Sequence, residues 1–236
     1  MEAFFQDCVG ILSEDQGADK LRGMADAVIG DLEEIWTAIK PEQPDYACRK
    51  GCSWCCHQNV TVTLPELHHI LAYLKSEFDQ TKLLSLKNKF REQAEKIAGK
   101  TTNERFDERT ACGFLENDAC SIHPARPLQC RGGFSEDEQY CRSLLEDREA
   151  TQNGVKDGTE QGKYLLAPKL IYNSAQLAMS SALRDAGLDG DAYELTVAMA
   201  LLLESFEPDQ PGALAPALLQ KIGTDYATPR SDNNQK

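Results

Sequence analysis

Residues 48–56 read CRKGCSWCC and place four cysteines within nine residues. Cys52 and Cys55 have the Cys-x-x-Cys spacing, in which two thiolates reach one metal ion while the backbone N–H groups between them turn toward the sulfurs. Gly51 suits the tight turn that such a loop needs. If the stretch is helical instead, the four cysteines fall at i, i+4, i+7 and i+8 and share one face. Either geometry predicts a surface lined with sulfur.

A second stretch carries three more cysteines. Cys112 is followed by Gly-Phe-Leu, and residues 120–131 read CSIHPARPLQCR. The glycine, asparagine, aspartate and prolines around these cysteines predict a loop that is ordered by what it binds. Arg126 and Arg131 would lower the pKa of nearby thiols and offset the charge of a thiolate site. The alternative for both arginines is an ion pair with Glu116 or Asp118, which would make them scaffolding.

The order of these residues resembles the YkgJ-type cysteine-cluster family of zinc- or iron-chelating proteins. The resemblance covers Cys48 to Arg131, with two departures: Gly113 stands where the family usually has proline, and His123 where it usually has tyrosine. A related class, the flagellin lysine methylases, carries a similar cluster that is thought to be iron–sulfur. The resemblance implies a metal site formed by Cys48, Cys52, Cys55, Cys56, Cys112, Cys120 and Cys130.

Further side chains near these thiols are candidate ligands. His57 adjoins Cys56, and His123 lies between Cys120 and Cys130, so either imidazole could bind the metal or orient a ligand. Cys141 follows eleven residues after Cys130 in an acidic stretch and is an open candidate for an eighth ligand. His68 and His69 are expected on an ordinary helix surface, and Cys8 is expected in the core among apolar residues.

The spacing favours an iron–sulfur cluster, with zinc as the alternative. Structural zinc sites usually combine two regular Cys-x-x-Cys pairs, whereas only one is regular here and the later cysteines are separated by seven and nine residues. Thiolates suit both metals.

Composition restricts the partners and the compartment. The 236 residues carry a formal net charge of −13, which disfavours binding to nucleic acid or to an anionic membrane. The first twenty residues are acidic and lack a signal-peptide pattern. We therefore expect a cytoplasmic protein whose nine cysteines serve metal or redox chemistry and not disulfides.

The apolar periodicity predicts a mainly α fold, a helical domain with a loop-rich cysteine-cluster metal site. Helices are expected over 21–39, from a capping box at Thr63-Leu64-Pro65-Glu66, over 83–98, over 164–186 and over 193–206. Only 59–63 looks like a strand, and 150–163 looks like a linker. The predicted organisation is an N-terminal helical segment (1–47), a metal-binding domain (48–149), a C-terminal helical segment packed on it (164–224) and a frayed tail (225–236).

No motif for nucleotide binding, hydrolysis or metalloprotease activity occurs, so no catalytic residue is predicted. Three functions remain open: a redox or cluster-dependent enzyme, a structural zinc-binding interaction protein without catalysis, and a metal-handling protein. The predicted partner is a metal ion or cluster.

Overall fold

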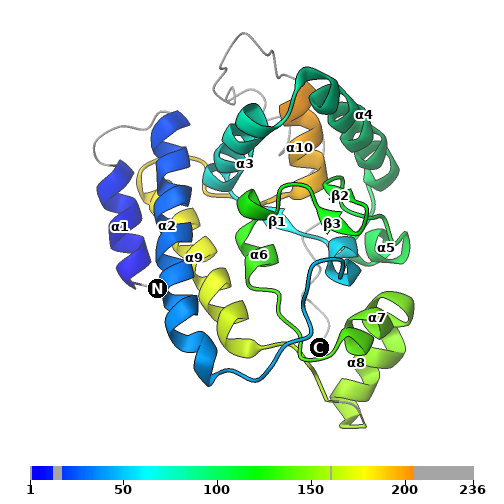
Figure 1. Cartoon of the computed structure of the whole chain (residues 1–236). Coiled ribbons are helices and arrows are strands. Elements are labelled where there is room, and N and C mark those ends of the chain that lie inside the picture. Colours follow the sequence, from blue (N-terminus) through cyan, green and yellow to red (C-terminus); the bar gives the residue numbers. More distant parts are fainter. Residues whose placement is uncertain (1, 13–17, 160, 205–236) are drawn as a thin grey trace.

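The computed structural model describes residues 2–12, 18–159 and 161–204, and it is mainly helical (Figure 1). The longer helices are α1 (Glu2–Leu12), α2 (Ala18–Ile39), α3 (Leu64–Glu77), α4 (Gln80–Ile97), α9 (Leu166–Asp185) and α10 (Leu195–Glu204). The shorter ones are α5 (Thr102–Asp107), α6 (Leu128–Arg131), α7 (Glu138–Glu146) and α8 (Arg148–Asp157), with the 3-10 turns η1 (Lys40–Glu42), η2 (Trp54–His57) and η3 (His123–Ala125). This confirms the predicted fold class.

The long helices form one continuous apolar core, which the second cysteine stretch joins through its own apolar side chains. Helix α1 packs on α2 and α9, α2 packs on α3, and α4 packs on α10 (Figure 1). The core includes Met24, Leu32, Phe90, Met179 and Met199, all fully buried. Burial of these side chains is the main force that holds the loop-rich middle of the chain between helices.

Helix α3 begins at the predicted capping box. The Glu66 carboxylate accepts hydrogen bonds from the N–H and the hydroxyl of Thr63, both at 2.8 Å, and Pro65 lies in the first turn. Helices α2, α4 and α9 confirm the other predicted helices within a few residues of each end. The region beyond Glu204, including the expected tail, lies outside the described residues.

Two short antiparallel sheets connect distant parts of the chain. Strand β1 (Thr61–Val62) confirms the predicted strand and pairs with β4 (Tyr193–Glu194). Residues 193–194 were expected to begin a helix, and they form a strand instead. Strand β2 (Leu115–Glu116) and strand β3 (Ala119–Cys120) form a hairpin within the second cysteine stretch. The β1–β4 pair fixes the segment after the first cysteine stretch to the start of α10.

Two further sequence expectations are wrong. Residues 148–157 form α8 and not a linker, because the Asp147 side chain accepts the Ala150 N–H at 3.2 Å and starts a helix that ends at Gly158 with φ of 80°. His68 is buried at 7% exposure in α3 and is not a surface residue.

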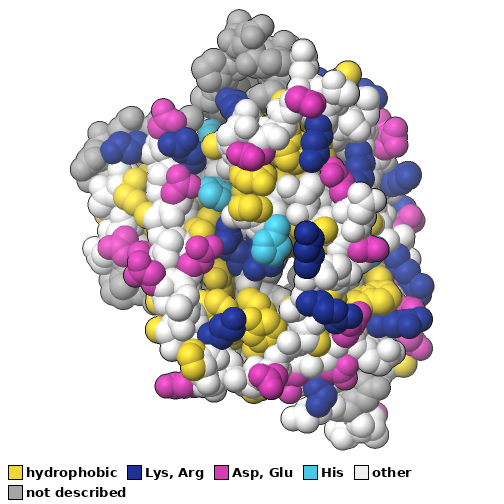
Figure 2. Space-filling model, viewed as in Figure 1, with side chains coloured by type: hydrophobic (Ala, Val, Ile, Leu, Met, Phe, Trp, Pro, Cys, Tyr) yellow, Lys and Arg dark blue, Asp and Glu magenta, His cyan; other side chains and the backbone are white. Residues whose placement is uncertain are grey.

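On the face in Figure 2, acidic side chains are scattered widely, whereas lysine, arginine and histidine side chains meet near the centre. In Figure 1 this central area corresponds to the region around α6. The net negative charge is therefore not spread evenly over this face.

Candidate metal centre

The first cysteine stretch folds as a turn followed by η2. Gly51 adopts φ of 91°, in the left-handed region that favours glycine, and the Cys52 N–H donates to the Arg49 carbonyl at 3.0 Å. Directly before the turn, the Ala47 N–H donates to the Ser135 carbonyl at 2.8 Å. The first of the two predicted geometries, a tight turn at Gly51, is therefore the one adopted.

The second stretch contains the β2–β3 hairpin. Its two-residue turn, Asn117 and Asp118, has φ of 48° and 58°, as a type I′ turn requires. Cys112 precedes the hairpin and Cys120 ends it, and the Leu115 N–H donates to the Cys112 carbonyl at 2.9 Å. The hairpin thus folds back so that both cysteines lie at its open end.

Gly113, one of the two departures from the family pattern, has a steric explanation. A Cβ atom at this position would lie 2.5 Å from Cζ of Phe90, whose ring packs in a T-shape on Phe114 with a centroid distance of 4.7 Å. The α4 ring therefore fills the place that a side chain would need.

The third cysteine segment is the short helix α6, which is held by a buried polar network. The Glu66 carboxylate accepts the Leu128 N–H at 2.9 Å and also accepts from the Gln176 amide at 2.9 Å. The Gln129 side chain accepts from the Thr61 N–H at 2.9 Å and donates to the Thr61 hydroxyl. These bonds fix the two residues directly before Cys130 to α3, α9 and β1.

The three segments converge on Cys55. Its thiol is hydrogen-bonded to that of Cys56. It also lies close enough to interact electrostatically with five further cysteines, which we call its electrostatic neighbours: Cys48, Cys52, Cys120, Cys130 and Cys141. Cys112 belongs to the same neighbourhood, since its N–H donates to the Cys56 carbonyl at 2.7 Å and it is an electrostatic neighbour of Cys120. Eight of the nine cysteines therefore gather in one region.

Backbone N–H groups point at several of these sulfurs. Cys52, Cys112 and Cys120 each accept from the residue two positions later, which are Trp54, Phe114 and Ile122. Cys48 accepts from the Ser135 N–H at 3.4 Å. A hydrogen bond donated to sulfur favours the thiolate, the form that binds metal.

Burial opposes these hydrogen bonds in the metal-free protein. Burial raises the pKa of the Cys112 thiol to about 12 and that of Cys130 well above its ordinary value. The hydrogen bond with Cys56 is the main cause of the raised pKa of Cys55. The thiols of Cys112, Cys130 and Cys55 are therefore protonated at neutral pH, and a metal ion must displace their protons to bind. Within the described part of the chain, no three side chains of His, Cys, Asp or Glu are already arranged as a metal site.

Cys141 lies with the cluster and Cys8 does not. The Cys141 thiol, on α7, is hydrogen-bonded to the Ser135 side chain and neighbours Cys48 and Cys52. Cys8 is fully buried on α1, where burial raises its pKa to about 12 and its charged neighbours are Asp7 and Asp31. This confirms the expectation of a core position for Cys8.

The two arginines of the motif have different surroundings. The buried Arg131 guanidinium pairs with Glu33 of α2 at 2.6 Å and donates to the Arg126 carbonyl at 2.9 Å. Arg131 therefore has a structural role, and its acidic partner is Glu33 and not Glu116 or Asp118. The Arg126 guanidinium makes no ion pair in the described residues, its buried Nε lacks a hydrogen-bond partner, and it neighbours the thiols of Cys48, Cys55, Cys120 and Cys130.

The two candidate histidine ligands differ in solvent exposure. His57 ends η2 beside Cys56, and its buried Nδ1 has no hydrogen-bond partner. His123 begins η3 and is exposed, and partial burial together with Arg126 and Arg131 lowers its pKa. His57 is therefore the better placed of the two to join the cluster.

Sequence reasoning missed three residues beside the cysteines. Ser135 contacts Cys48 and Cys141, and the Tyr164 hydroxyl binds the Gln58 side chain at 2.7 Å near Cys141 and Cys55. Glu138 accepts from Trp54 at 3.2 Å. Serine, tyrosine and glutamate have no spacing signal relative to cysteine, so only the tertiary structure identifies them.

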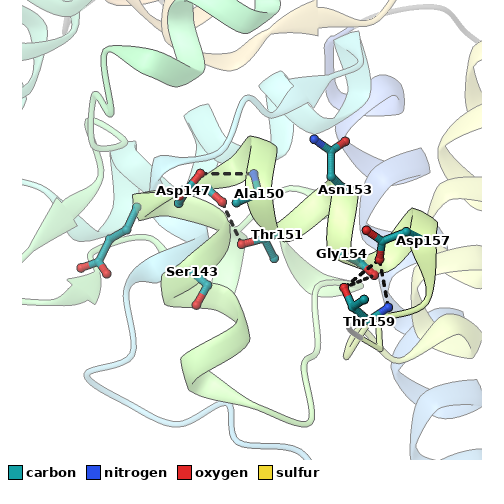
Figure 3. Close-up of a pocket in the computed structure, with 9 residues that line it drawn as sticks. Ser143, Asp147, Ala150, Thr151, Asn153, Gly154, Asp157 and Thr159 are labelled. Atoms are coloured by element: carbon teal, nitrogen blue, oxygen red, sulfur yellow. Dashed lines mark hydrogen bonds between the residues drawn. The ribbon is translucent and has the colours of Figure 1, made fainter.

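A separate open pocket of about 400 Å³ lies between α7 and α8 (Figure 3). Its lining includes Asp147, Asp157 and Thr159, and no cysteine. The Asp147 and Asp157 carboxylates are occupied by hydrogen bonds from Ala150 and Thr159. The pocket is therefore distinct from the cysteine region.

A family model matches residues 47–148, and it is that of the CxxCxxCC family, described as "Putative zinc- or iron-chelating domain". The match spans the three cysteine segments and α7, and it confirms for these residues the family that the cysteine order resembles. Neither a curated protein nor a solved structure matches the chain. The matched segment supports metal chelation and leaves zinc and iron as the two choices.

Proposed function

We propose that this protein holds an iron–sulfur cluster through its gathered thiolates and has a redox or cluster-dependent role. The proposed ligands come from the three cysteine segments: Cys48, Cys52, Cys55, Cys56, Cys112, Cys120 and Cys130, with Cys141 in addition. The observation that carries metal binding is the set of backbone N–H groups directed at Cys48, Cys52, Cys112 and Cys120. Such hydrogen bonds stabilise thiolates and tune the potential of a cluster. The irregular spacing of the later cysteines is what favours a cluster over zinc.

The donor set fits a soft metal centre. Thiolates bind iron and zinc strongly, and the surrounding turns supply N–H groups that stabilise the thiolates. When bound, an iron–sulfur cluster would supply one-electron chemistry. Arg126 would offset part of the thiolate charge, because its guanidinium neighbours four of the thiols and makes no ion pair within the described residues.

Structural zinc binding is the second candidate. The N–H···S bonds from residue i+2 at Cys52, Cys112 and Cys120 are equally suited to zinc, because zinc sites also use turns with inward N–H groups. In that case the ion would fasten the hairpin and α6 to the 48–57 turn, and the protein would be an interaction or metal-handling protein.

Nine free cysteines support a reducing compartment, so we place the protein in the cytoplasm. None of the described helices is long and apolar enough to cross a membrane. No nucleic-acid partner is proposed, because the chain carries a net charge of −13.

Single Cys→Ser variants test the ligand set. Replacing Cys52, Cys55, Cys112, Cys120 or Cys130 should remove at least about half of the bound metal, because a site lacking one soft ligand binds more weakly. Cys8→Ser is the matched control and should keep all of it. Full metal content in any two of the five variants would refute the assigned site.

A further inference from the structure

The capping box that begins α3 has an exposed counterpart before α5. In α3, the Glu66 carboxylate accepts from the N–H and the hydroxyl of Thr63, both at 2.8 Å. Before α5, the Glu104 carboxylate accepts from the same two groups of Thr101, at 2.7 and 2.8 Å. Glu104 and Thr101 are exposed, whereas Glu66 is 2% and Thr63 0% exposed. A helix cap needs no burial, so the burial of Glu66 points to the other contacts of its carboxylate.

The two oxygens of the Glu66 carboxylate have different partners. Oε2 accepts from the N–H and the hydroxyl of Thr63, and from the Gln176 side chain of α9 at 2.9 Å. Oε1 accepts the Leu128 N–H, the first N–H of α6, at 2.9 Å. An ionised carboxylate is acceptor-only, so it can serve these donors together. One side chain therefore connects the starts of α3 and α6 with α9.

Gln176 extends the network to the residue directly before Cys130. Its Nε2 also donates to the Thr61 carbonyl at 3.0 Å, and its Oε1 accepts from the Gln129 side chain at 3.3 Å. Leu128 and Gln129, which are both held from outside α6, are the two residues before Cys130. Helix α6 is a single turn of four residues, which does not form stably alone. The place of Cys130 therefore depends on bonds from α3 and α9.

We propose that Glu66 is a positioning residue for Cys130, which it holds in the cysteine region by accepting the Leu128 N–H. The inference rests on the proposed metal binding, in which Cys130 is a ligand, and it adds a residue of α3 to that site. The bond from Gln176 to the same carboxylate makes the position of α6 depend on α9 as well.

Glu66→Gln distinguishes this role from helix capping. An amide of the same shape offers one acceptor oxygen and one NH₂ group. Three donors meet Oε2 and one meets Oε1, so the amide oxygen should keep the Oε2 side and the NH₂ group should face the Leu128 N–H. This buried N–H then opposes another donor and loses its acceptor. The substitution should therefore release α6 and leave the start of α3 intact.

Hydrogen exchange and thiol alkylation of the reduced, metal-free full chain test the hold on α6. In Glu66→Gln, the Leu128 N–H should exchange at least about tenfold faster, because α6 opens locally. For the same reason Cys130 should react with iodoacetamide at least about tenfold faster. Unchanged rates at both groups would overturn the proposal.

Controls separate local from global opening. The Leu67 N–H, which donates to the Thr63 carbonyl within α3, and the fully buried Cys8 thiol should keep their rates in Glu66→Gln. Glu104→Gln changes the matched exposed box and should leave every rate as it is. Equal acceleration at α6, α3 and Cys8 in Glu66→Gln would show a loss of global stability and overturn the positioning role.

Titration of the same chains with Co²⁺ under argon tests the consequence for metal. Glu66→Gln should bind about tenfold more weakly and show less thiolate-to-cobalt absorption per bound ion, because one thiolate no longer reaches the ion. Met24→Ala, which leaves a cavity in the core at α2, lowers stability and should keep the absorption per ion. Full affinity and absorption in Glu66→Gln would overturn the positioning role and leave the proposed metal binding intact. No uptake by the unaltered chain would overturn both.

A second variant serves if Glu66→Gln loses its helical circular dichroism. Gln176→Met keeps the volume of the side chain and removes its bonds to Glu66, Thr61 and Gln129. It should accelerate exchange at Leu128 and alkylation at Cys130 about threefold, because part of the network remains. Unchanged rates in this variant would likewise overturn the proposal.

Discussion

At the scale of single residues, Arg126 and Arg131 show how one motif contains two roles. Both guanidinium groups lie close to thiols in the chain, yet Arg131 is neutralised by Glu33 and Arg126 has no acidic partner within the described residues. An unpaired cation beside protonatable thiols favours their ionised form. Arg126 is therefore assigned to the metal centre and Arg131 to the fold.

Glutamine substitutions separate these roles. Arg126→Gln should weaken metal binding about tenfold and, with a cluster bound, lower its reduction potential, while leaving the melting temperature of the metal-free protein within a few degrees. Arg131→Gln should instead destabilise the metal-free protein by about 2–4 kcal/mol, because it leaves Glu33 and two carbonyl groups without their donor. Metal titration and thermal unfolding are the measurements. Equal effects of both substitutions on both readouts would contradict the assignment.

His68 gives the fold a pH dependence. Burial is the main cause that lowers its pKa from 6.5 to about 4, so the unfolded chain takes up a proton first as the pH falls. The stabilisation is complete above pH 6.5 and is lost between pH 6.5 and 4. The unfolding free energy should fall by about 2 kcal/mol from pH 7 to pH 5 through this residue.

His68→Leu removes this contribution, so the variant should lose about 2 kcal/mol less than the natural chain over the same pH range. Urea unfolding of both proteins in metal-free form at the two pH values measures the difference. An identical pH dependence would show that His68 is not buried in its neutral form.

At the scale of secondary-structure elements, the cysteine segments differ in how many buried apolar side chains hold them in place. The hairpin and α6 contribute the fully buried side chains of Phe114, Ile122 and Leu128, so this stretch has apolar anchors of its own. The 48–57 turn has no buried residue. Metal should therefore order the turn more than it orders the hairpin.

Removal of metal should expose the turn to trypsin. Arg49 and Lys50 are exposed beside Gly51, and loss of the metal should raise the cleavage rate there at least about fivefold, because local opening no longer has to release the ion. Arg184, exposed on the packed helix α9, is the internal control and should not change. Mass spectrometry of timed digests gives both rates. Equal acceleration at the two sites would indicate global unfolding and contradict local ordering by metal.

The sequence predicted the elements whose signals are local. The capping box at Thr63 and Glu66, and the apolar repeat of α2, lie within one helix each and were located correctly. Strand β4 was missed because its partner β1 lies about 130 residues away, and α8 because Asp147 started a helix in a polar stretch that contains Gly154. The seven motif cysteines follow from the family resemblance and stay a prediction. Ser135, Tyr164 and the Glu33 partner of Arg131 depend on tertiary packing, which the sequence does not reveal.

At the scale of the whole molecule, the metal-binding segment depends on helices outside it. Strand β4 pairs with β1, the Leu165 N–H donates to the Phe134 carbonyl at 2.9 Å, and α9 packs on α6. The long helices also supply most of the apolar core. The segment matched by the family model is therefore part of a larger folding unit.

A fragment of residues 47–148 should consequently fold poorly. Without α2, α9 and α10 it lacks most of the surface on which α3, α4 and α6 pack, so it should show weak helical circular dichroism and bind Co²⁺ at least about tenfold more weakly than the full chain. Both measurements use the full chain as the reference. A fragment that folds and binds Co²⁺ as tightly as the full chain would show that residues 47–148 form an autonomous domain and do not need the outer helices.

The most direct test of the central claim is metal and sulfide analysis, with an absorption spectrum, of the full chain purified without oxygen. The proposed iron–sulfur centre predicts a brown protein with broad visible absorption, iron and acid-labile sulfide in similar amounts, and loss of both in Cys112→Ser but not in Cys8→Ser. A colourless protein with zinc and no sulfide would contradict the cluster and select the zinc alternative. A protein that retains neither iron nor zinc, and takes up neither on reconstitution, would contradict metal binding altogether.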